Sequence, residues 1–386
     1  MQTVPLWQDE PYAPRPALEG DARADVCVVG AGIGGLAIAW RLVATGADVL
    51  VLDAAEVAGG ASGRNGGFFI AGAAPMYHEG VARWGRERAA AIHRATLDAQ
   101  REMLATAEAV GAAEHFRMTG MLRLAVDPQE ARDVEAHAAA LAADGFEGEL
   151  VHELPAPLAR PGRIGLLSRH DGAVHPVRWL RALARAIEAR GGRIAERTRV
   201  VAPPEAGSVV TDRGTVRCEH VVVAMDGTLA ALVPTAAAVR ARRLNMLATA
   251  PVEPLLPCPV YARYGHEYVQ QTADGRIALG GFSDLDGAAS WTDRPEPSVP
   301  VQERLDAYLR EELVEAPVTH RWAGVVGYAE DPLPRCGAVP GTSGRVLALG
   351  GYNGTGHVQA WVAAGFVAGR LAGGAPAALY AAVDAA

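Results

Sequence analysis

The chain has 386 residues, enough for about two domains, and half of its residues are hydrophobic, so a large core is expected. Acidic residues outnumber basic residues by 44 to 36, and no basic run or aromatic–basic stripe points to nucleic acid as a partner. No uncharged apolar run reaches about 18 residues, so we expect no membrane-spanning helix. The chain contains no lysine, so no lysine can serve as a base, a Schiff-base nucleophile or an activator of oxygen.

The cysteines point to a reduced protein. Cys27, Cys218, Cys258 and Cys336 are far apart in the sequence and form no C-x-x-C pair. We interpret them as free thiols and predict a cytoplasmic protein without a metal site. The first 21 residues lack the basic and apolar pattern of a signal peptide.

The first regular elements form a β-turn-α-β unit. Val26–Val29 is a short apolar run typical of a buried parallel strand, and residues 36–45 carry apolar side chains at helical spacing. Gly46 suits the end of that helix, and residues 48–53 form a second apolar strand. A strand, a glycine-rich turn, a helix and a second strand within about thirty residues predict a Rossmann unit.

The remaining elements follow from periodicity and from turn residues. Helices are predicted over about 86–110, 129–143, 176–190, 301–313 and 356–374. Strands are predicted over 120–126, 193–201, 208–211, 214–218, 220–224 and 345–351, with a further set between 242 and 282.

The turn after the first strand fits a dinucleotide site. Gly30, Gly32 and Gly35 match G-x-G-x-x-G between a strand and a helix, and Asp53 ends the second strand. Glycines there allow backbone N–H groups to approach a pyrophosphate at the helix N-terminus, and an acid at Asp53 can accept hydrogen bonds from ribose hydroxyls. The predicted contacts are Gly30, Ala31, Gly32, Ile33, Gly34, Gly35, Asp53 and Ala54.

The segment "GGASGRNGGFF", residues 59–69, contains five glycines in eleven positions. It begins six residues after Asp53, so the same fold would bring it to the flavin end of an extended FAD. We expect a large flat ring against this backbone, with polar side chains bonded to its rim; a plain surface loop is the alternative. The predicted contacts are Gly60, Ala61, Ser62, Arg64, Asn65, Gly66 and Gly67.

These motifs carry a family resemblance. "ADVCVVGAGIGG" followed by "GGASGRNGG" resembles the N-terminus of D-amino-acid-oxidase-type FAD-dependent oxidoreductases. The similarity is greatest to the gamma-glutamylputrescine oxidase-like branch, among glycine and sarcosine oxidase relatives. "RRLNMLATAP", "DGRIALGG", "DPLPRCG" and "GGYNGTGH" match later landmarks of that family in order, so the resemblance covers nearly the whole chain.

The resemblance implies an α/β fold with a discontinuous Rossmann-type FAD-binding domain and an α+β substrate domain built on an antiparallel sheet. It places residues 1–80, 160–235 and 320–386 in the first domain, and 81–159 and 236–319 in the second. It adds Val200, Gly324, Gly351, Gly354, Thr355 and Gly356 to the FAD contacts. The segment "RWAGVVGYAED" has no cysteine for flavin attachment, and Cys336 lies beyond Asp331, so we expect noncovalent FAD.

The implied activity is oxidation of the C–N bond of an amine or amino acid to an imine, by hydride transfer to flavin N5. The reoxidant would be O₂ or another electron acceptor, and we favour an oxidase over a dehydrogenase. Another flavoenzyme class, an NAD(P)H-dependent hydroxylase, is an alternative, but such enzymes usually carry a "GD" segment where this chain has "GGYNGTG". A non-catalytic flavoprotein partner is the second alternative.

The reacting side chains are less defined by the sequence. If residues 261–271 form one strand, Tyr264, His266 and Tyr268 share one face, and Arg263, Gly265 and Glu267 share the other. The predicted catalytic residues are Tyr264, His266, Tyr268 and Tyr352, with Tyr77, His78 and His357 as further candidates. An amino-acid substrate would need an arginine for its carboxylate, and Arg263, Arg321 and Arg243 are the possibilities.

Overall fold

The protein is described by a computed structural model in which residues 2–373 and 379–385 are placed. Gly374, the last residue of the predicted closing helix, and the extreme ends of the predicted domain segments 1–80 and 320–386 lie outside these residues. None of the helices in the described ranges combines the length and apolar character that a bilayer span requires. The four cysteine thiols are free.

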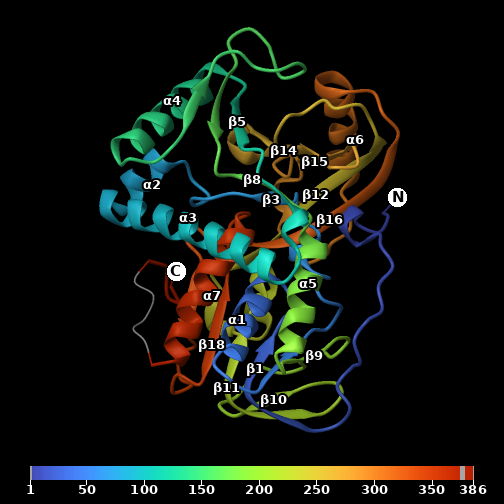
Figure 1. Ribbon diagram of the computed structural model, residues 1–386, viewed down its shortest axis with the longest axis vertical. Coiled ribbons are helices and arrows are strands. Elements are labelled where there is room, and N and C mark those ends of the chain that lie inside the picture. The colour runs from blue at the N-terminus through green and yellow to red at the C-terminus, as the bar shows by residue number, and fades with distance from the viewer. Residues whose placement is uncertain (1, 374–378, 386) are drawn as a thin grey trace.

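The lower layer of the molecule in Figure 1 is built on a seven-stranded sheet with the order β17–β18–β11–β1–β2–β9, in which β10 also pairs with β11. The pairs β17–β18 and β10–β11 are antiparallel and the others are parallel. The strands are β1 (Ala22–Val29), β2 (Val49–Leu52), β9 (Arg193–Ala195), β10 (Ser208–Val210), β11 (Thr215–Val223), β17 (Arg335–Ala338) and β18 (Val346–Gly350).

Strand β1 is buried on both faces because its alternate residues enter two cores. Val26 and Val28 pack with residues of α1 (Ile33–Val43), α5 (Pro176–Ala189) and α7 (Gly356–Leu371). Cys27 and Val29 pack on the other face, with Leu229 of the short helical segment Asp226–Ala231. A strand covered on both sides reads as an unbroken apolar run, which is why the sequence predicted it.

The upper layer is an eight-stranded, mostly antiparallel sheet with the order β16–β12–β15–β14–β13–β5–β7–β6. Its one parallel pair is β13–β5. The strands are β5 (Met121–Ala125), β6 (Glu149–Val151), β7 (Ile164–Ser168), β12 (Arg240–Pro251), β13 (Val260–Ala262), β14 (Glu267–Gln271), β15 (Arg276–Gly281) and β16 (Val318–Tyr328). The predicted fold class, a Rossmann-type parallel sheet joined to an antiparallel sheet, is confirmed.

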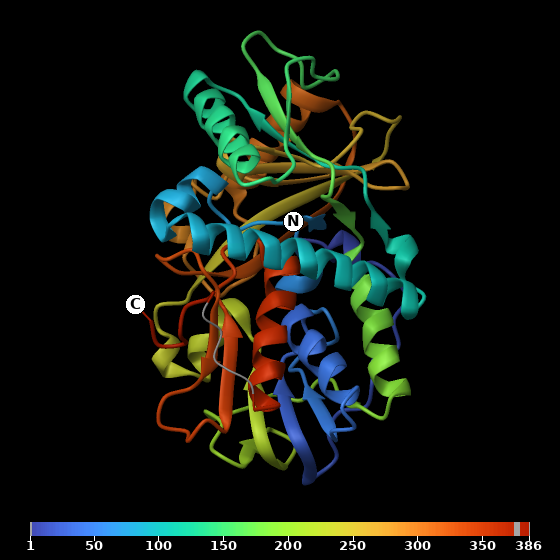
Figure 2. The ribbon, with the colours of Figure 1, turned by 60° about the vertical axis from the view of Figure 1, so that its left-hand side comes forward.

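The two layers are joined across the middle of the molecule. Figure 2 shows the long helix α3 (Arg86–Ala109) crossing between them, and α3 contacts both α2 (Tyr77–Trp84) and α7. A small sheet of β3 (Phe68–Phe69), β8 (Gly172–Val174) and β4 (Phe116–Arg117) lies in the same region. Helices α4 (Pro128–Ala143) and α6 (Val299–Tyr308) belong to the upper layer.

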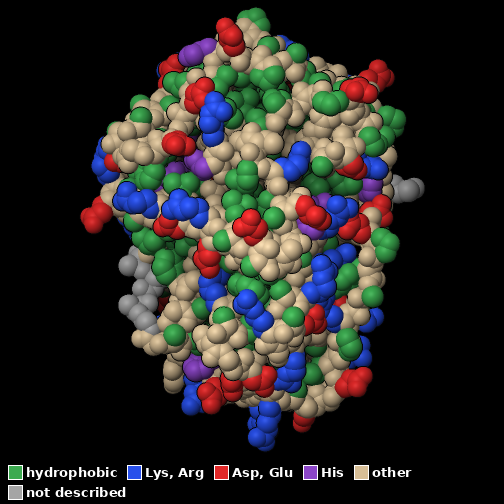
Figure 3. All heavy atoms as spheres, viewed as in Figure 1, with side chains coloured by type: hydrophobic (Ala, Val, Ile, Leu, Met, Phe, Trp, Pro, Cys, Tyr) green, Lys and Arg blue, Asp and Glu red, His purple; other side chains and the backbone are tan. Residues whose placement is uncertain are grey.

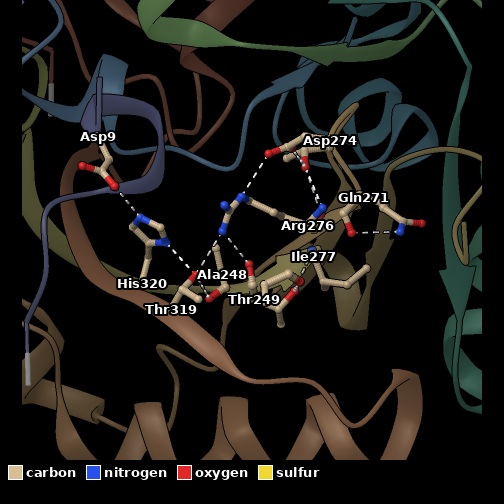
Figure 4. Close-up of polar contacts among 12 residues, drawn as sticks. Asp9, Ala248, Thr249, Gln271, Asp274, Arg276, Ile277, Thr319 and His320 are labelled. Atoms are coloured by element: carbon tan, nitrogen blue, oxygen red, sulfur yellow. Dashed lines mark hydrogen bonds and ion pairs between the residues drawn. The ribbon is translucent and has the colours of Figure 1, made fainter. Parts of the chain in front are cut away.

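A β-bulge in β12 is closed by side-chain hydrogen bonds, which Figure 4 shows. The pairing register of β12 with both neighbouring strands shifts at this point. Thr249 Oγ1 accepts the N–H of Ile277 at 3.0 Å, and Arg276 Nη1 donates to the Thr249 carbonyl at 3.1 Å. Nearby on β16, His320 Nε2 lies 3.1 Å from the Asp9 carboxylate, so the N-terminal segment is fastened to this sheet.

Several predicted boundaries need correction. The segments 214–218 and 220–224 form one strand, β11, and the strand predicted over 193–201 is only β9. The antiparallel sheet takes β7 and β16, although the expected domain segments 160–235 and 320–386 include residues of both. We propose to divide the chain by sheet, with these two strands in the substrate domain.

On the face shown in Figure 3, acidic and basic side chains are interspersed.

Candidate active site

A cavity of about 410 Å³, here called the main cavity, lies where residues of the two layers meet. The start of α1, the loop after β2, the start of α7 and one residue of β16, Gly324, form one side, which we call the glycine wall: Gly32, Ile33, Gly34, Ala61, Ser62, Arg64, Asn65, Gly66, Gly324, Gly354, Thr355 and Gly356. The antiparallel sheet and its turns form the other side, the tyrosine wall: Arg242, Tyr261, Tyr264, His266, Tyr268 and Tyr328. Tyr352 also lines the cavity.

The turn before α1 requires glycine because backbone from other segments occupies the side-chain space. A Cβ on Gly35 would lie 1.8 Å from the carbonyl oxygen of Gly30, and a Cβ on Gly30 would lie 2.4 Å from that of Ala224. Gly30 also has φ +108°, which side chains disfavour. These two glycines therefore position the N-terminus of α1 without lining the cavity.

That N-terminus presents backbone amides. Ser62 Oγ accepts the N–H of Ile33 at 3.0 Å, and within the described ranges the amides of Gly34 and Gly35 have no protein acceptor. Asp53 holds the turn from the other side, since its carboxylate accepts the N–H groups of Ala31 at 2.7 Å and Ala55 at 2.8 Å. Burial raises the pKa of Asp53. The free amides and the helix dipole make this end of α1 suited to an anion.

The glycine-rich segment 59–69 is held by distant side chains. Trp7 Nε1 donates to the carbonyl of Asn65 at 2.7 Å, and Trp322 Nε1 donates to that of Arg64 at 2.9 Å. Gln270 Nε2 donates to the carbonyl of Gly67 at 3.0 Å. The sequence offered no signal for these three supports, because they lie far from the loop in the chain. Their bonds fix the edge of the main cavity.

The explanation expected for these glycines is wrong in part. A Cβ on Gly63 would lie 2.0 Å from the carbonyl oxygen of Ala58, and a Cβ on Gly67 would lie 2.5 Å from Gln270 Nε2. Protein atoms, not only a bound ring, exclude side chains at these positions. Gly60 faces open space, with no atom within 4 Å of an added Cβ.

Asp226 is a functional candidate that the sequence reasoning missed. It follows β11, and its carboxylate accepts the N–H groups of Gly327 at 2.9 Å, Gly351 at 2.9 Å and Tyr352 at 3.3 Å. Burial raises the pKa of this carboxyl, while the backbone N–H groups lower it. The residue thus ties the loop before α7 to β16 beside the cavity. An acid at the carboxyl end of a buried strand, the position that Asp53 has on β2, was an available signal.

Three phenols of the tyrosine wall, those of Tyr261, Tyr268 and Tyr328, are partly buried. Within the described part of the chain, the hydroxyls of Tyr261, Tyr268 and Tyr328 have no hydrogen-bond partner, and burial raises the pKa of each. Burial also lowers the pKa of His266. At neutral pH this wall therefore offers protonated phenols and a neutral imidazole.

The structure corrects the prediction of one strand over 261–271. The chain leaves β13 at Ala262, turns through Arg263 and Tyr264 with φ of +47° and +57°, and re-enters the sheet in β14. The backbone N–H of Tyr264 is donated to the Glu130 carboxylate at 2.7 Å instead of to a strand. Tyr264, 43% exposed, therefore stands at the rim of the cavity, and its hydroxyl bonds to Asp133.

The arginines expected to hold a substrate carboxylate are engaged elsewhere. Arg263 pairs with Glu267 at 2.7 Å, Arg321 with Asp306 at 2.8 Å and Arg243 with Asp286 at 2.8 Å. None of the three lines the main cavity. Arg242, which the sequence reasoning passed over, does line it, and its guanidinium lies 5.2 Å from the Trp291 ring.

The other sequence-predicted residues do not line the cavity. This group comprises Gly30, Ala31, Gly35, Asp53, Ala54, Gly60, Gly67, Val200 and Gly351. Val200 bridges to Thr211 and packs in the core beneath the parallel sheet. Of the further candidates, Tyr77 donates its hydroxyl to Asp144 at 2.6 Å and lines an adjoining cavity, and His78 lines neither space.

His357 gives a test of whether the main cavity suits a polar cofactor. It is the second residue of α7, is buried, and lines the cavity. Neither ring nitrogen has a hydrogen-bond partner, and burial lowers the pKa of His357 to about 4. Unpaired buried polar atoms are rare in native proteins, so a polar ligand at this position fits the structure.

Comparisons with known proteins agree with this geometry. A family described as "FAD dependent oxidoreductase" (DAO) matches residues 25–370. A probable oxidoreductase OrdL of Rhizobium meliloti is 29% identical over 361 residues, which cover 89% of this chain and 82% of the relative. The gamma-glutamylputrescine oxidoreductase of Escherichia coli is 26% identical over 379 residues, 94% of this chain and 87% of that protein.

The fold has a counterpart among solved structures. Glycine oxidase from Geobacillus kaustophilus superposes with a TM-score of 0.77 at 21% identity, over 92% of this chain and 96% of the oxidase. The match to the family over residues 25–370 identifies the chain as a member of the DAO family of FAD-dependent oxidoreductases.

Proposed function

We propose that the protein oxidises the C–N bond of an amine or amino acid, with noncovalently bound FAD as the electron acceptor. The observation that carries this proposal is the main cavity, in which a wall of backbone amides faces a wall of phenols. A cavity of this size, lined mostly by apolar surface with a few placed polar groups, favours an enzyme over a non-catalytic flavoprotein. Two of the relatives support the substrate class, since they are named a gamma-glutamylputrescine oxidoreductase and a glycine oxidase.

The glycine wall would hold the cofactor. The amides of Gly34 and Gly35 at the start of α1 suit the pyrophosphate, and Asp53 has free lone pairs for ribose hydroxyls. The start of α7, with His357, would meet the flavin end, where the helix dipole favours added negative charge. FAD, when bound, takes up the electron pair removed from the C–N bond. No cysteine lines the main cavity in the described part of the chain, which supports noncovalent attachment.

The tyrosine wall would hold the substrate. An amine must lose its ammonium proton before its carbon can give up a hydride, and with a pKa near 10.4 only about one alkylamine in 2,500 is neutral at pH 7. His266 lines the cavity as a neutral imidazole, so it can accept that proton. The phenols of Tyr261, Tyr268 and Tyr328 would orient the amine and limit water.

We further propose that O₂ reoxidises the reduced flavin. In the absence of lysine, the cations nearest the reaction are Arg64 and Arg242, which line the main cavity. Either guanidinium can stabilise a developing negative charge on oxygen. If reduced protein reoxidises in aerated buffer no faster than free reduced flavin, the protein is a dehydrogenase instead.

The test is an anaerobic panel. Purified holoprotein is mixed with amines, amino acids, hydroxy acids and NADH, and the visible absorbance of oxidised flavin is followed. We expect bleaching by a nitrogen compound, faster at higher pH, together with an aldehyde or keto acid as product. Bleaching by NADH or a hydroxy acid alone would overturn the proposal, and acid-precipitated protein that keeps its flavin would overturn noncovalent attachment.

A further inference from the structure

A second, smaller cavity of about 60 Å³, the side cavity, adjoins the main cavity behind the tyrosine wall. The two cavities share lining residues, among them Ile70, Tyr261 and Tyr264. The side cavity is much smaller than the main cavity but has room for a small group such as a carboxylate. Its polar lining includes Arg123, His93 and His137.

Arg123 differs from Arg64 and Arg242, which also have no acidic partner in the described residues, because those two donate hydrogen bonds to neutral groups and Arg123 donates none. It lies on β5 beside Tyr261 of β13, with its guanidinium 6.0 Å from the Tyr261 ring. Within the described ranges it makes no hydrogen bond or ion pair, whereas Arg263, Arg321 and Arg243 all have acidic partners. An arginine inside a protein without a partner is unfavourable, so an anion is expected to meet it.

The acids closest to Arg123 are committed to other donors. Glu130 accepts the N–H groups of Val126 at 3.0 Å and Tyr264 at 2.7 Å. Asp171 accepts the N–H of Ala71 at 2.8 Å and Gln100 Nε2 at 3.0 Å. Neither carboxylate forms an ion pair with Arg123, so the guanidinium remains available to a ligand.

The histidines add neutral donors to the same space. Nδ1 of His137 accepts the N–H of Tyr77 at 2.8 Å, which in a neutral ring leaves the proton on Nε2 as a donor. His93 is 7% exposed, and its Nε2 is buried without a partner. Burial lowers the pKa of His93 to about 4, so this ring is also neutral at pH 7. A guanidinium flanked by ring N–H groups matches the oxygens of a carboxylate.

We propose that the side cavity binds the carboxylate of the substrate through Arg123, which makes the substrate class an amine that carries a carboxylate rather than a simple alkylamine. This assignment rests on the proposed function. The reacting nitrogen would stay in the main cavity, and the carboxylate would reach past Tyr261. Arg242 is the competing site, since it lines the main cavity and donates through Nε to Ser290 Oγ at 3.3 Å.

The first experiment needs no turnover and uses acetate as the probe. Holoprotein is titrated with sodium acetate against sodium chloride at constant ionic strength, and the rise in Tm and the change in flavin absorbance give the dissociation constant. We expect Arg123→Met to weaken acetate binding at least tenfold and Arg123→Lys to weaken it less. Arg41→Met is the matched control, because Arg41 also stacks on an aromatic ring, that of Trp361 at 4.4 Å, but lines neither cavity.

The second experiment compares an amino acid with the amine made by removing its carboxylate. Arg123→Met should raise KM for the amino acid at least tenfold with kcat changed less than twofold, and should leave the amine unaffected. If Arg123→Met does not fold, the KM of Arg123→Lys for the amino acid is measured instead, and it should also rise. An unchanged acetate affinity, or a loss confined to Arg242→Gln, would overturn the assignment. If no nitrogen compound reduces the flavin, the proposed function fails, while the acetate titration still reports on Arg123.

Discussion

The two walls of the main cavity recognise ligands by different means. The glycine wall uses backbone, and the glycines that position it have no room for a side chain, as the 1.8 Å approach of a Gly35 Cβ to the Gly30 carbonyl shows. The tyrosine wall uses side-chain hydroxyls, and those of Tyr261, Tyr268 and Tyr328 have no partner within the described part of the chain. Recognition by backbone suits a cofactor that stays the same among related proteins, whereas side chains can be substituted to suit different substrates. We therefore expect substitutions on the two walls to have separable effects.

The largest effect should come from Gly35, which positions the glycine wall at the start of α1. Gly35→Ala forces a methyl group against backbone, so we expect a loss of about 3 kcal/mol or more in the free energy of unfolding, with little FAD retained. Thermal unfolding and the flavin-to-protein ratio measure this. Gly60→Ala is the control, since its Cβ meets no atom within 4 Å, and it should change stability by less than about 1 kcal/mol. Equal effects of the two substitutions would show that the steric clash at Gly35 does not cause the loss of stability.

His357 tests whether a side chain on the backbone-rich side behaves as a buried neutral base. Its pKa of about 4 in the folded protein lies below the usual 6.5. The unfolded chain therefore binds the proton first, and stability present above pH 6.5 is lost as the pH falls towards 4. The loss attributable to this residue is about 3 kcal/mol. Denaturant unfolding at a series of pH values should show a shallower decline for His357→Gln; the same decline in both proteins would refute the assignment.

Asp53 tests whether the parallel layer binds the ribose of FAD. Asp53→Asn removes a charged acceptor for ribose hydroxyls, so FAD should bind about ten- to a hundredfold more weakly, equivalent to about 1.5–3 kcal/mol. The dissociation constant is measured by titrating apoprotein with FAD. Asp48→Asn, just before the same strand and paired with Arg193, should leave it unchanged. Parallel losses in both variants would indicate a general effect on the strand.

The tyrosine wall should give the smallest change, and only in turnover. Tyr268→Phe removes one neutral hydrogen bond to substrate, so kcat/KM should fall about two- to tenfold, or about 0.5–1.5 kcal/mol, with FAD affinity unchanged. Tyr308→Phe is the control, because Tyr308 is also buried in the antiparallel layer but lies outside the cavity. A fall in FAD affinity for Tyr268→Phe would contradict the assignment of cofactor binding to the glycine wall and substrate binding to the tyrosine wall.

The parallel layer was predictable because its signals are local. Val26–Val29, the glycine turn and Asp53 lie within about thirty residues, and strands buried on both faces read as unbroken apolar runs. The same locality explains why the residues of the glycine wall near α1 and β2 could be named from sequence, whereas Gly324, Gly354, Thr355 and Gly356 were named only from the family resemblance. Asp226 could have been found by the same reasoning, since it closely follows β11, the strand next to β1.

The tyrosine wall could be predicted only in part because distant residues shape it. Alternation of Tyr264, His266 and Tyr268 indicated one strand, but Glu130, 134 residues away, takes the Tyr264 N–H and the strand breaks. All three residues still line the main cavity. Arg123 was inside a predicted strand, but nothing local indicated that its charge would be left unpaired beside a cavity.

The most direct test of this division is anaerobic flavin reduction at saturating FAD, compared for Asp53→Asn and Tyr268→Phe. With FAD saturating, Asp53→Asn should reduce its flavin at the rate of the unmodified protein, and Tyr268→Phe should be slower at subsaturating substrate. If Asp53→Asn is as slow as Tyr268→Phe once its flavin site is filled, the two walls do not act separately, and the account given for the site is contradicted.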